Sequence, residues 1–105
     1  MGGSENIGMD ILEKAIRHYG PQNQMMMVLE ENAELSQAIT KYIRSTKKGQ
    51  FNEIIKARKN VVEEIADVLI VIEQLKIMLD IQNYEINCVK DYKLNRLKER
   101  IEKGE

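Results

Sequence analysis

The stretch Ile65-Ala66-Asp67-Val68-Leu69-Ile70-Val71-Ile72 places one carboxylate inside an otherwise unbroken apolar run. Its β-branched residues also suit a strand, but the charged flanks and the long helical period favour a helix. A helix that is apolar nearly all round is covered on more than one side. If this stretch belongs to a core, Asp67 is largely dehydrated, and an unpaired buried charge is strongly destabilising. We therefore expect another group to compensate the Asp67 carboxylate.

Helical patterns extend outward from this stretch over most of the chain. Hydrophobic residues make up 43% of the 105 residues and charged residues 31%, with one proline and no tryptophan, which is typical of a helical protein. Apolar periodicity, the Gly20-Pro21 break and two polar turns predict four helices, at about 11–18, 22–44, 52–79 and 84–102. We predict one all-α domain over residues 1–105, built as a four-helix bundle, with residues 1–9 as a flexible tail.

The predicted third helix has more apolar surface than so short a chain can bury. A monomer of 105 residues buries only a modest core. We expect the remaining cover to come from a second subunit, so the predicted assembly is a homo-oligomer, either a dimer or a tetramer.

Charge and cysteine content narrow the class of protein. The formal net charge of -1 gives no global field that would select a polyanion, so we do not expect a nucleic-acid-binding protein. No apolar run approaches the roughly 20 residues that a membrane span needs, and no signal-peptide pattern stands at the start. The single cysteine, Cys88, excludes an internal disulfide and fits a reducing compartment. We expect a cytoplasmic protein without membrane partners.

Four acidic residues form two pairs with the same spacing. Glu31 and Glu34 are three residues apart, as are Glu64 and Asp67. Residues three apart on a helix differ by about 300°, so the side chains of each pair share one face. If the second and third helices pack antiparallel, both pairs lie at a similar depth, roughly 15–20 Å from the connecting turn. The four carboxylates would then converge.

Converging carboxylates with no nearby cysteine or histidine suit a hard cation, Mg²⁺ or Mn²⁺. A di-iron bundle would use Glu-x-x-His pairs, and His18, the only histidine, has no glutamate three residues before it. The alternative for the acids is a solvated helix face with scattered ion pairs. Glu30 and Glu63 directly precede the proposed ligands and point about 100° away, as outer groups or solvated ones. Glu30 with Glu34 is an alternative one-turn pair.

Polar and basic residues could bind a substrate around these acids. Lys41 lies seven residues past Glu34, on the same helix face, and could reach a phosphate beside the cations. Gln24 lies seven residues before Glu31 and could hydrogen-bond a base or a sugar. Seven basic residues and one acid lie between Lys41 and Lys59. Basic runs on helices are more often solvated faces, and that reading stays open here.

The order of these motifs resembles a known family. The residues that carry the resemblance are Gln24, Glu30-Glu31-Asn32-Ala33-Glu34-Leu35, Ala38, Lys41, Glu63-Glu64-Ile65-Ala66-Asp67-Val68 and Lys93-Leu94-Asn95-Arg96-Leu97. They are similar to the MazG-type nucleoside triphosphate pyrophosphohydrolases of the all-α NTP pyrophosphatase superfamily, whose signature is Glu-x-x-Glu, a spacer, and Glu-x-x-Asp. The resemblance covers roughly residues 24–101. The spacer from Leu35 to Glu63, 29 residues, is at the long end for that family and implies a long hairpin.

The resemblance implies a Mg²⁺-dependent hydrolase with a MazG-like bundle. Glu31, Glu34, Glu64 and Asp67 would hold the metal and form the catalytic centre, and Lys93 and Arg96 would bind phosphates. A nucleoside triphosphate would be hydrolysed to the monophosphate and pyrophosphate by a metal-activated water that attacks the α-phosphorus. Two alternatives remain: a relative specific for dUTP, dCTP or phosphoribosyl-ATP, and a non-catalytic helical module for oligomerisation or regulation.

Overall fold

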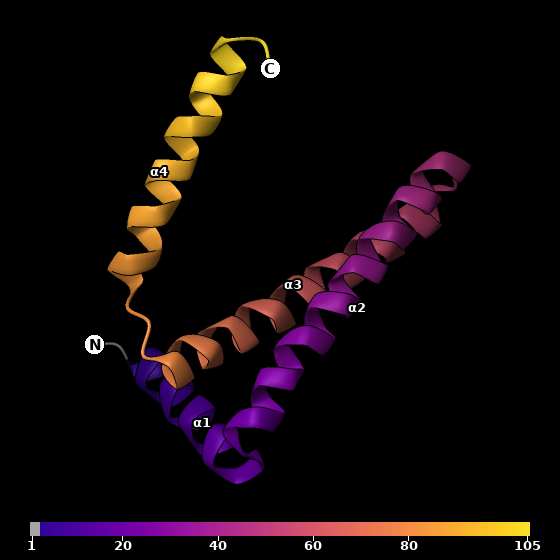
Figure 1. Cartoon of the computed structure of the whole chain (residues 1–105). Helices are drawn as coiled ribbons and strands as arrows, with labels where there is room; N and C mark the ends of the chain where they lie inside the picture. Colours follow the sequence, from indigo (N-terminus) through magenta and orange to yellow (C-terminus); the bar gives the residue numbers. More distant parts are fainter. Residues whose placement is uncertain (1–2) are drawn as a thin grey trace.

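The computed structural model describes residues 3–105, with side chains from residue 10 onward. Its helices are α1 (Gly3–Tyr19), α2 (Pro21–Lys48), α3 (Phe51–Leu79) and α4 (Asn83–Glu102). The described residues contain no strand, which confirms the all-α prediction. Figure 1 shows α2 and α3 as a long hairpin, α1 across its open end, and α4 extending away from both.

The first helix is longer than the sequence pattern predicted. α1 begins at Gly3, so the predicted start near Ile11 is wrong, and residues 3–9, expected as part of a tail, lie in the helix. Asp10, which with Glu13 three residues later has the spacing of a capping box, lies inside α1 and does not cap it. The reason is that Ile7, Ile11 and Ala15 continue one apolar row at helical spacing, which outweighs the capping signal at Asp10.

The hairpin turn is short because one glycine ends α2. Gly49 has a φ of 73°, a left-handed conformation that favours glycine. Its backbone N–H donates to the Ser45 carbonyl at 3.1 Å. The predicted end at Arg44 is wrong by one turn, because Lys47 and Lys48 extend α2 and interact favourably with its C-terminal dipole. α3 begins directly afterwards, so the two helices run antiparallel.

The buried core of one chain is small. Its apolar members are Val28 and Ala38 on α2 and Val68 and Val71 on α3. The apolar stretch of α3 from Ile65 to Ile72 is therefore covered on one side only. On its uncovered side, Leu69 is 58% exposed. The sequence predicted that α3 would be covered on more than one side. Within the part of one chain that the structure describes, no second side of α3 is covered.

The last helix is separate from the rest of the chain. Asp80 ends α3 in a left-handed conformation with a φ of 53°. The backbone N–H of Gln82 donates to Glu85 Oε2 at 2.8 Å, so Gln82 caps α4 and the helix begins at Asn83, one residue before the predicted start at 84. Between residues 3 and 105, α4 packs against none of α1, α2 and α3, although Lys76 Nζ donates a hydrogen bond to Asn83 Oδ1 beside the turn. The predicted four-helix bundle is therefore wrong for a single chain, because the apolar stripe of α4 finds no surface within its own chain.

None of the helices in the described part of the chain is long and apolar enough to cross a membrane.

Candidate metal centre

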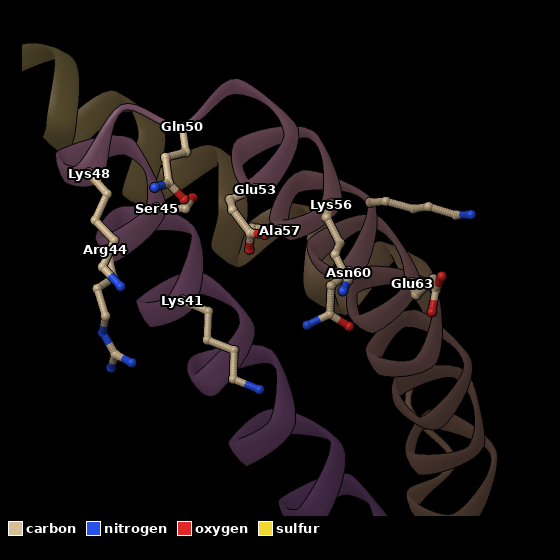
Figure 2. A pocket seen from close by; sticks show the side chains of 11 residues that line it. Lys41, Arg44, Ser45, Lys48, Gln50, Glu53, Lys56, Ala57, Asn60 and Glu63 are labelled. Atoms are coloured by element: carbon tan, nitrogen blue, oxygen red, sulfur yellow. The ribbon is translucent and has the colours of Figure 1, made fainter.

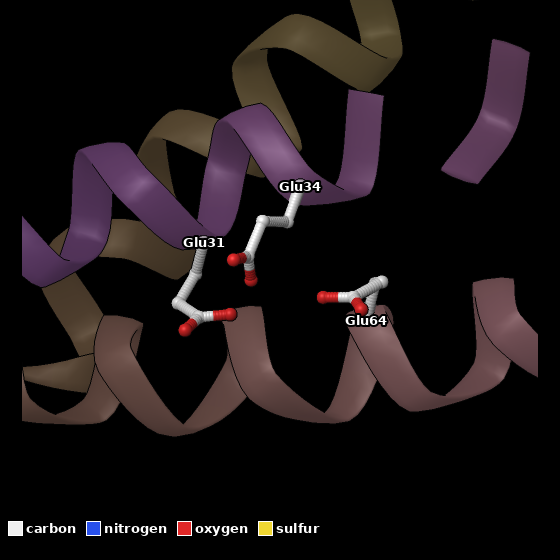
Figure 3. A group of neighbouring side chains, drawn as sticks. All are labelled: Glu31, Glu34 and Glu64. Atoms are coloured by element: carbon white, nitrogen blue, oxygen red, sulfur yellow. The ribbon is translucent and has the colours of Figure 1, made fainter. Parts of the chain in front are cut away.

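Three of the four predicted acidic ligands converge between the two hairpin helices. Glu31 and Glu34 project from α2, and Glu64 faces them from α3 (Figure 3). One carboxylate oxygen from each residue lies within 4.8 Å of the others. The 3.6-residue period places Glu31 and Glu34 on one face, and the antiparallel register of α2 and α3 brings Glu64 opposite them. The prediction of convergence is confirmed for these three residues.

Asp67 lies beside this trio and not within it. It is one turn further along α3, towards the open end of the hairpin, where α2 and α3 diverge (Figure 1). Its side chain is exposed, so the expected dehydration of Asp67 is wrong for the single chain. Its negative charge nevertheless raises the pKa of both Glu31 and Glu64. Asp67 is therefore an electrostatic neighbour of the trio.

The trio contains two oxygen atoms that are sealed from solvent and have no partner. These atoms are Glu31 Oε2 and Glu64 Oε1, and neither accepts a hydrogen bond. Buried acceptors are nearly always satisfied, and an unsatisfied one is destabilising. Among the described residues the one ion pair within 4 Å joins Lys76 to Glu73, so no lysine or arginine neutralises the trio. The arrangement lacks positive charge at its centre.

Repulsion within the trio changes its titration. Burial, the adjoining Glu34 carboxyl, and the charges of Asp67 and Glu64 together raise the pKa of Glu31 from 4.5 to about 7. Burial, followed by the charges of Glu34, Asp67 and Glu63, also raises the pKa of Glu64. Without a cation, the trio therefore holds a proton near neutral pH.

The donor set fits a hard divalent cation. It consists of carboxylate oxygens without nitrogen or sulfur, which is the chemistry that Mg²⁺ and Mn²⁺ prefer. Mg²⁺ binds oxygen at about 2.1 Å, so opposite ligands lie about 4.2 Å apart. Neighbouring ligands in the same octahedron lie about 3.0 Å apart. The three oxygens, which lie within 4.8 Å of one another, would therefore draw closer together on binding one ion. The two unpartnered oxygens would then gain the positive charge that they lack.

We expect the stability of the metal-free protein to fall as pH rises. The folded chain holds the Glu31 proton more tightly than the unfolded chain, so this contribution is complete below pH 4.5 and is lost as pH approaches 7. The loss should be on the order of 1 kcal/mol, because solvent screens this half-exposed group. Saturating Mg²⁺ should reverse it at pH 8 and have little effect at pH 5. Melting temperatures measured with and without Mg²⁺ at pH 5 and at pH 8 test this prediction. An equal Mg²⁺-induced rise in melting temperature at the two pH values would contradict it.

One cavity of about 470 Å³ adjoins the trio on the side towards α1. Gln24, the predicted substrate-binding amide, lines it together with Glu31 and Asp67 and is 7% exposed. Gln74 lines the same cavity and is 4% exposed. The sequence analysis missed Gln74, although it follows Asp67 by seven residues, just as Gln24 precedes Glu31 by seven. This matching seven-residue spacing could have identified Gln74 from the sequence.

The remaining predicted residues are not members of the trio. Lys41 and Glu63 line a second cavity towards the hairpin turn, and Glu30 is an exposed residue of α2. Lys93 and Arg96 are exposed on α4, and the Arg96 guanidinium lies 5.8 Å from the centre of the Tyr92 ring. Because α4 does not pack on the hairpin, the structure does not bring these two residues to the trio within one chain.

Searches of protein-family models, of curated proteins and of solved structures found no match to this chain. The motif residues and the geometry of the trio are therefore the basis for any functional conclusion.

Proposed function

We propose that this protein is a Mg²⁺-dependent nucleoside triphosphate pyrophosphohydrolase. The observation that carries the proposal is the convergence of Glu31, Glu34 and Glu64 around two sealed, unpartnered oxygens. A solvated helix face would leave these oxygens in contact with water. The order of the acidic motifs, which resembles that of the MazG-type enzymes, supports the same reading. The residues that would hold Mg²⁺ are these three, with Asp67 beside them.

The chemistry follows from what these side chains can do. Mg²⁺ bound there would neutralise phosphate charge and lower the pKa of a nearby water. In the reaction, a water oxygen bonds to the α-phosphorus, and the bond from that phosphorus to the bridging oxygen breaks, so that pyrophosphate leaves. Asp67 is exposed beside the trio and is positioned to accept the proton of that water. Glu30 and Glu63 add negative charge next to the ligands that they precede.

We propose that the nucleoside binds in the 470 Å³ cavity next to the trio. Ligand cavities of this size combine apolar walls with a few polar groups that fix orientation. Here Met27, Ile70 and Val71 supply apolar surface, and the amides of Gln24 and Gln74 supply donors and acceptors. The same amides could select a deoxynucleotide such as dUTP or dCTP, or phosphoribosyl-ATP, so these narrower substrates are alternatives within the proposal.

The proposal includes a homo-oligomer. Exposed apolar residues follow a heptad pattern along one face of α3, at Ile55, Val62, Ile65, Leu69 and Ile72. A second exposed apolar stripe runs along α4 and includes Val89, Leu94, Leu97 and Ile101. Two unpartnered stripes on one small chain suit pairing between copies. Such pairing could bring Lys93 and Arg96 of one copy to the trio of another.

A non-catalytic helical module is the second candidate, and the extent of exposed apolar surface favours it. In that case the acidic trio would not act on a nucleotide, although pairing through α3 and α4 would still occur.

An activity assay over a nucleotide panel separates the two candidates. The eight common NTPs and dNTPs, together with dUTP and phosphoribosyl-ATP, would be incubated with and without Mg²⁺, and phosphate would be measured after added pyrophosphatase. We expect phosphate release that requires both Mg²⁺ and the added pyrophosphatase, because the primary product is pyrophosphate. Absence of turnover on every nucleotide would favour the non-catalytic module.

A further inference from the structure

A basic groove lies at the closed end of the hairpin, on the opposite side of the trio from the cavity that holds Gln24. It has a volume of about 680 Å³ and lies between the end of α2 and the start of α3. Figure 2 shows Lys41, Arg44 and Lys48 along the α2 wall, and Lys56 and Asn60 along the α3 wall. We call this cavity the tip groove.

The tip groove concentrates positive charge in a chain whose net charge is -1. Its lining includes five cationic side chains, Lys41, Arg44, Lys48, Lys56 and Lys59, and two carboxylates, Glu53 and Glu63. None of these seven groups forms an ion pair within 4 Å, since the one such pair among the described residues is on α3 at Lys76. The cations repel one another, so an anion bound among them would relieve that repulsion.

Position separates the tip groove from the acidic trio. Lys48 is fourteen residues past Glu34 on α2, roughly 21 Å along the helix axis. A nucleotide whose α-phosphate lies at the trio does not extend its other two phosphates that far. Lys41 could serve such a substrate, but Arg44, Lys48 and Lys56 are placed for a different anion.

We propose that the tip groove binds a compact multi-phosphate anion independently of metal. The side-chain amides of Gln50 and Asn60 accompany the cations and can donate hydrogen bonds to phosphate oxygens. Single-stranded nucleic acid is disfavoured, because its binding grooves present aromatic side chains for stacking and this lining has none. Glu63, at the end of the groove nearer the trio, repels the anion towards the hairpin turn.

Inorganic triphosphate in the presence of EDTA is the probe for calorimetric titration. We expect binding that weakens as salt concentration rises. Arg44→Gln/Lys48→Gln should weaken it by about tenfold or more, because each cation makes a charge-assisted contact. The matched double variant Lys98→Gln/Lys103→Gln, which removes two exposed cations on or just after α4, should bind as the wild type does. Glu53→Gln should tighten binding severalfold, because it removes a carboxylate from the lining.

Further measurements can overturn the proposal. Glu64→Gln should leave metal-free triphosphate binding unchanged, which separates the tip groove from the acidic trio. No binding in EDTA, or equal weakening by the two double variants, would refute the tip groove as an anion site. An unstructured oligo-dT that binds more tightly than triphosphate, and loses affinity in Arg44→Gln/Lys48→Gln, would assign the groove to nucleic acid instead.

Discussion

Glu64→Gln is expected to abolish most of the pyrophosphohydrolase activity while leaving the fold intact. The substitution removes the α3 ligand from the trio and keeps the size of the side chain. Loss of even an outer-shell partner of a metal lowers affinity or activity by about 10–100-fold, and loss of a direct ligand should exceed that range. Steady-state turnover with a preferred nucleotide measures the effect.

The same variant carries an opposite expectation for stability. Without metal at pH 8, Glu64→Gln should melt at a higher temperature than the wild type, because it removes one of the charges that repel Glu31. It should also lose the Mg²⁺-dependent rise in melting temperature that the wild type shows. Asp67→Asn should lose that rise only in part, since Asp67 lies beside the trio. It should still lower turnover by about 100-fold or more, because it removes the carboxylate proposed to accept the proton of the attacking water. Higher stability together with lost activity is the signature of a functional acidic cluster.

The control for Glu64→Gln is Glu13→Gln, which neutralises an exposed glutamate on α1. We expect this control to keep wild-type turnover and wild-type response to Mg²⁺. Full activity in Glu64→Gln would remove Glu64 from the active centre and with it the proposed hydrolase mechanism.

Leu69→Glu is expected to dissociate the protein into single chains. Leu69 is 58% exposed in one chain and lies in the middle of the α3 heptad stripe. On a free surface, such a substitution changes stability by within about 0.5 kcal/mol. In an interface it places a charge against apolar surface, which costs several kcal/mol. Sedimentation velocity should show a fall in mass, and the melting temperature should fall by several degrees.

The matched control is Asn52→Glu, which adds one carboxylate to the same helix about 100° away from the stripe. Its location in the first turn of α3 makes the new charge favourable to the helix dipole. We expect it to keep the mass of the wild type. A wild-type protein that sediments as one chain, or a Leu69→Glu variant that stays assembled, would contradict pairing through α3.

Several features of the candidate site could be predicted before the structure was known. The three-residue spacing of Glu31 and Glu34 specified one helix face, and the hairpin register specified that Glu64 would lie opposite. Helix ends were less predictable. α2 continues to Lys48 because Gly49 provides the left-handed residue that ends it, whereas the pattern suggested a turn from Ser45. The apolar period prevailed over the local capping signal at the start of α1, whereas the left-handed Gly49 decided the end of α2.

What the amino-acid sequence determined by itself was local: the helical type of every segment, the faces on which the acids lie, and the acid pairing by one helical turn. These features depend only on the geometry of a single helix. The tertiary structure decided the rest. Divergence of α2 and α3 at the open end left Asp67 outside the trio, and the approach of their other ends formed the tip groove. α4 stands apart from the hairpin, and Gln74 became a neighbour of Gln24. The physical reason is that the packing of helices against one another depends on which apolar surfaces bury each other. The apolar periodicity of each helix does not specify that choice.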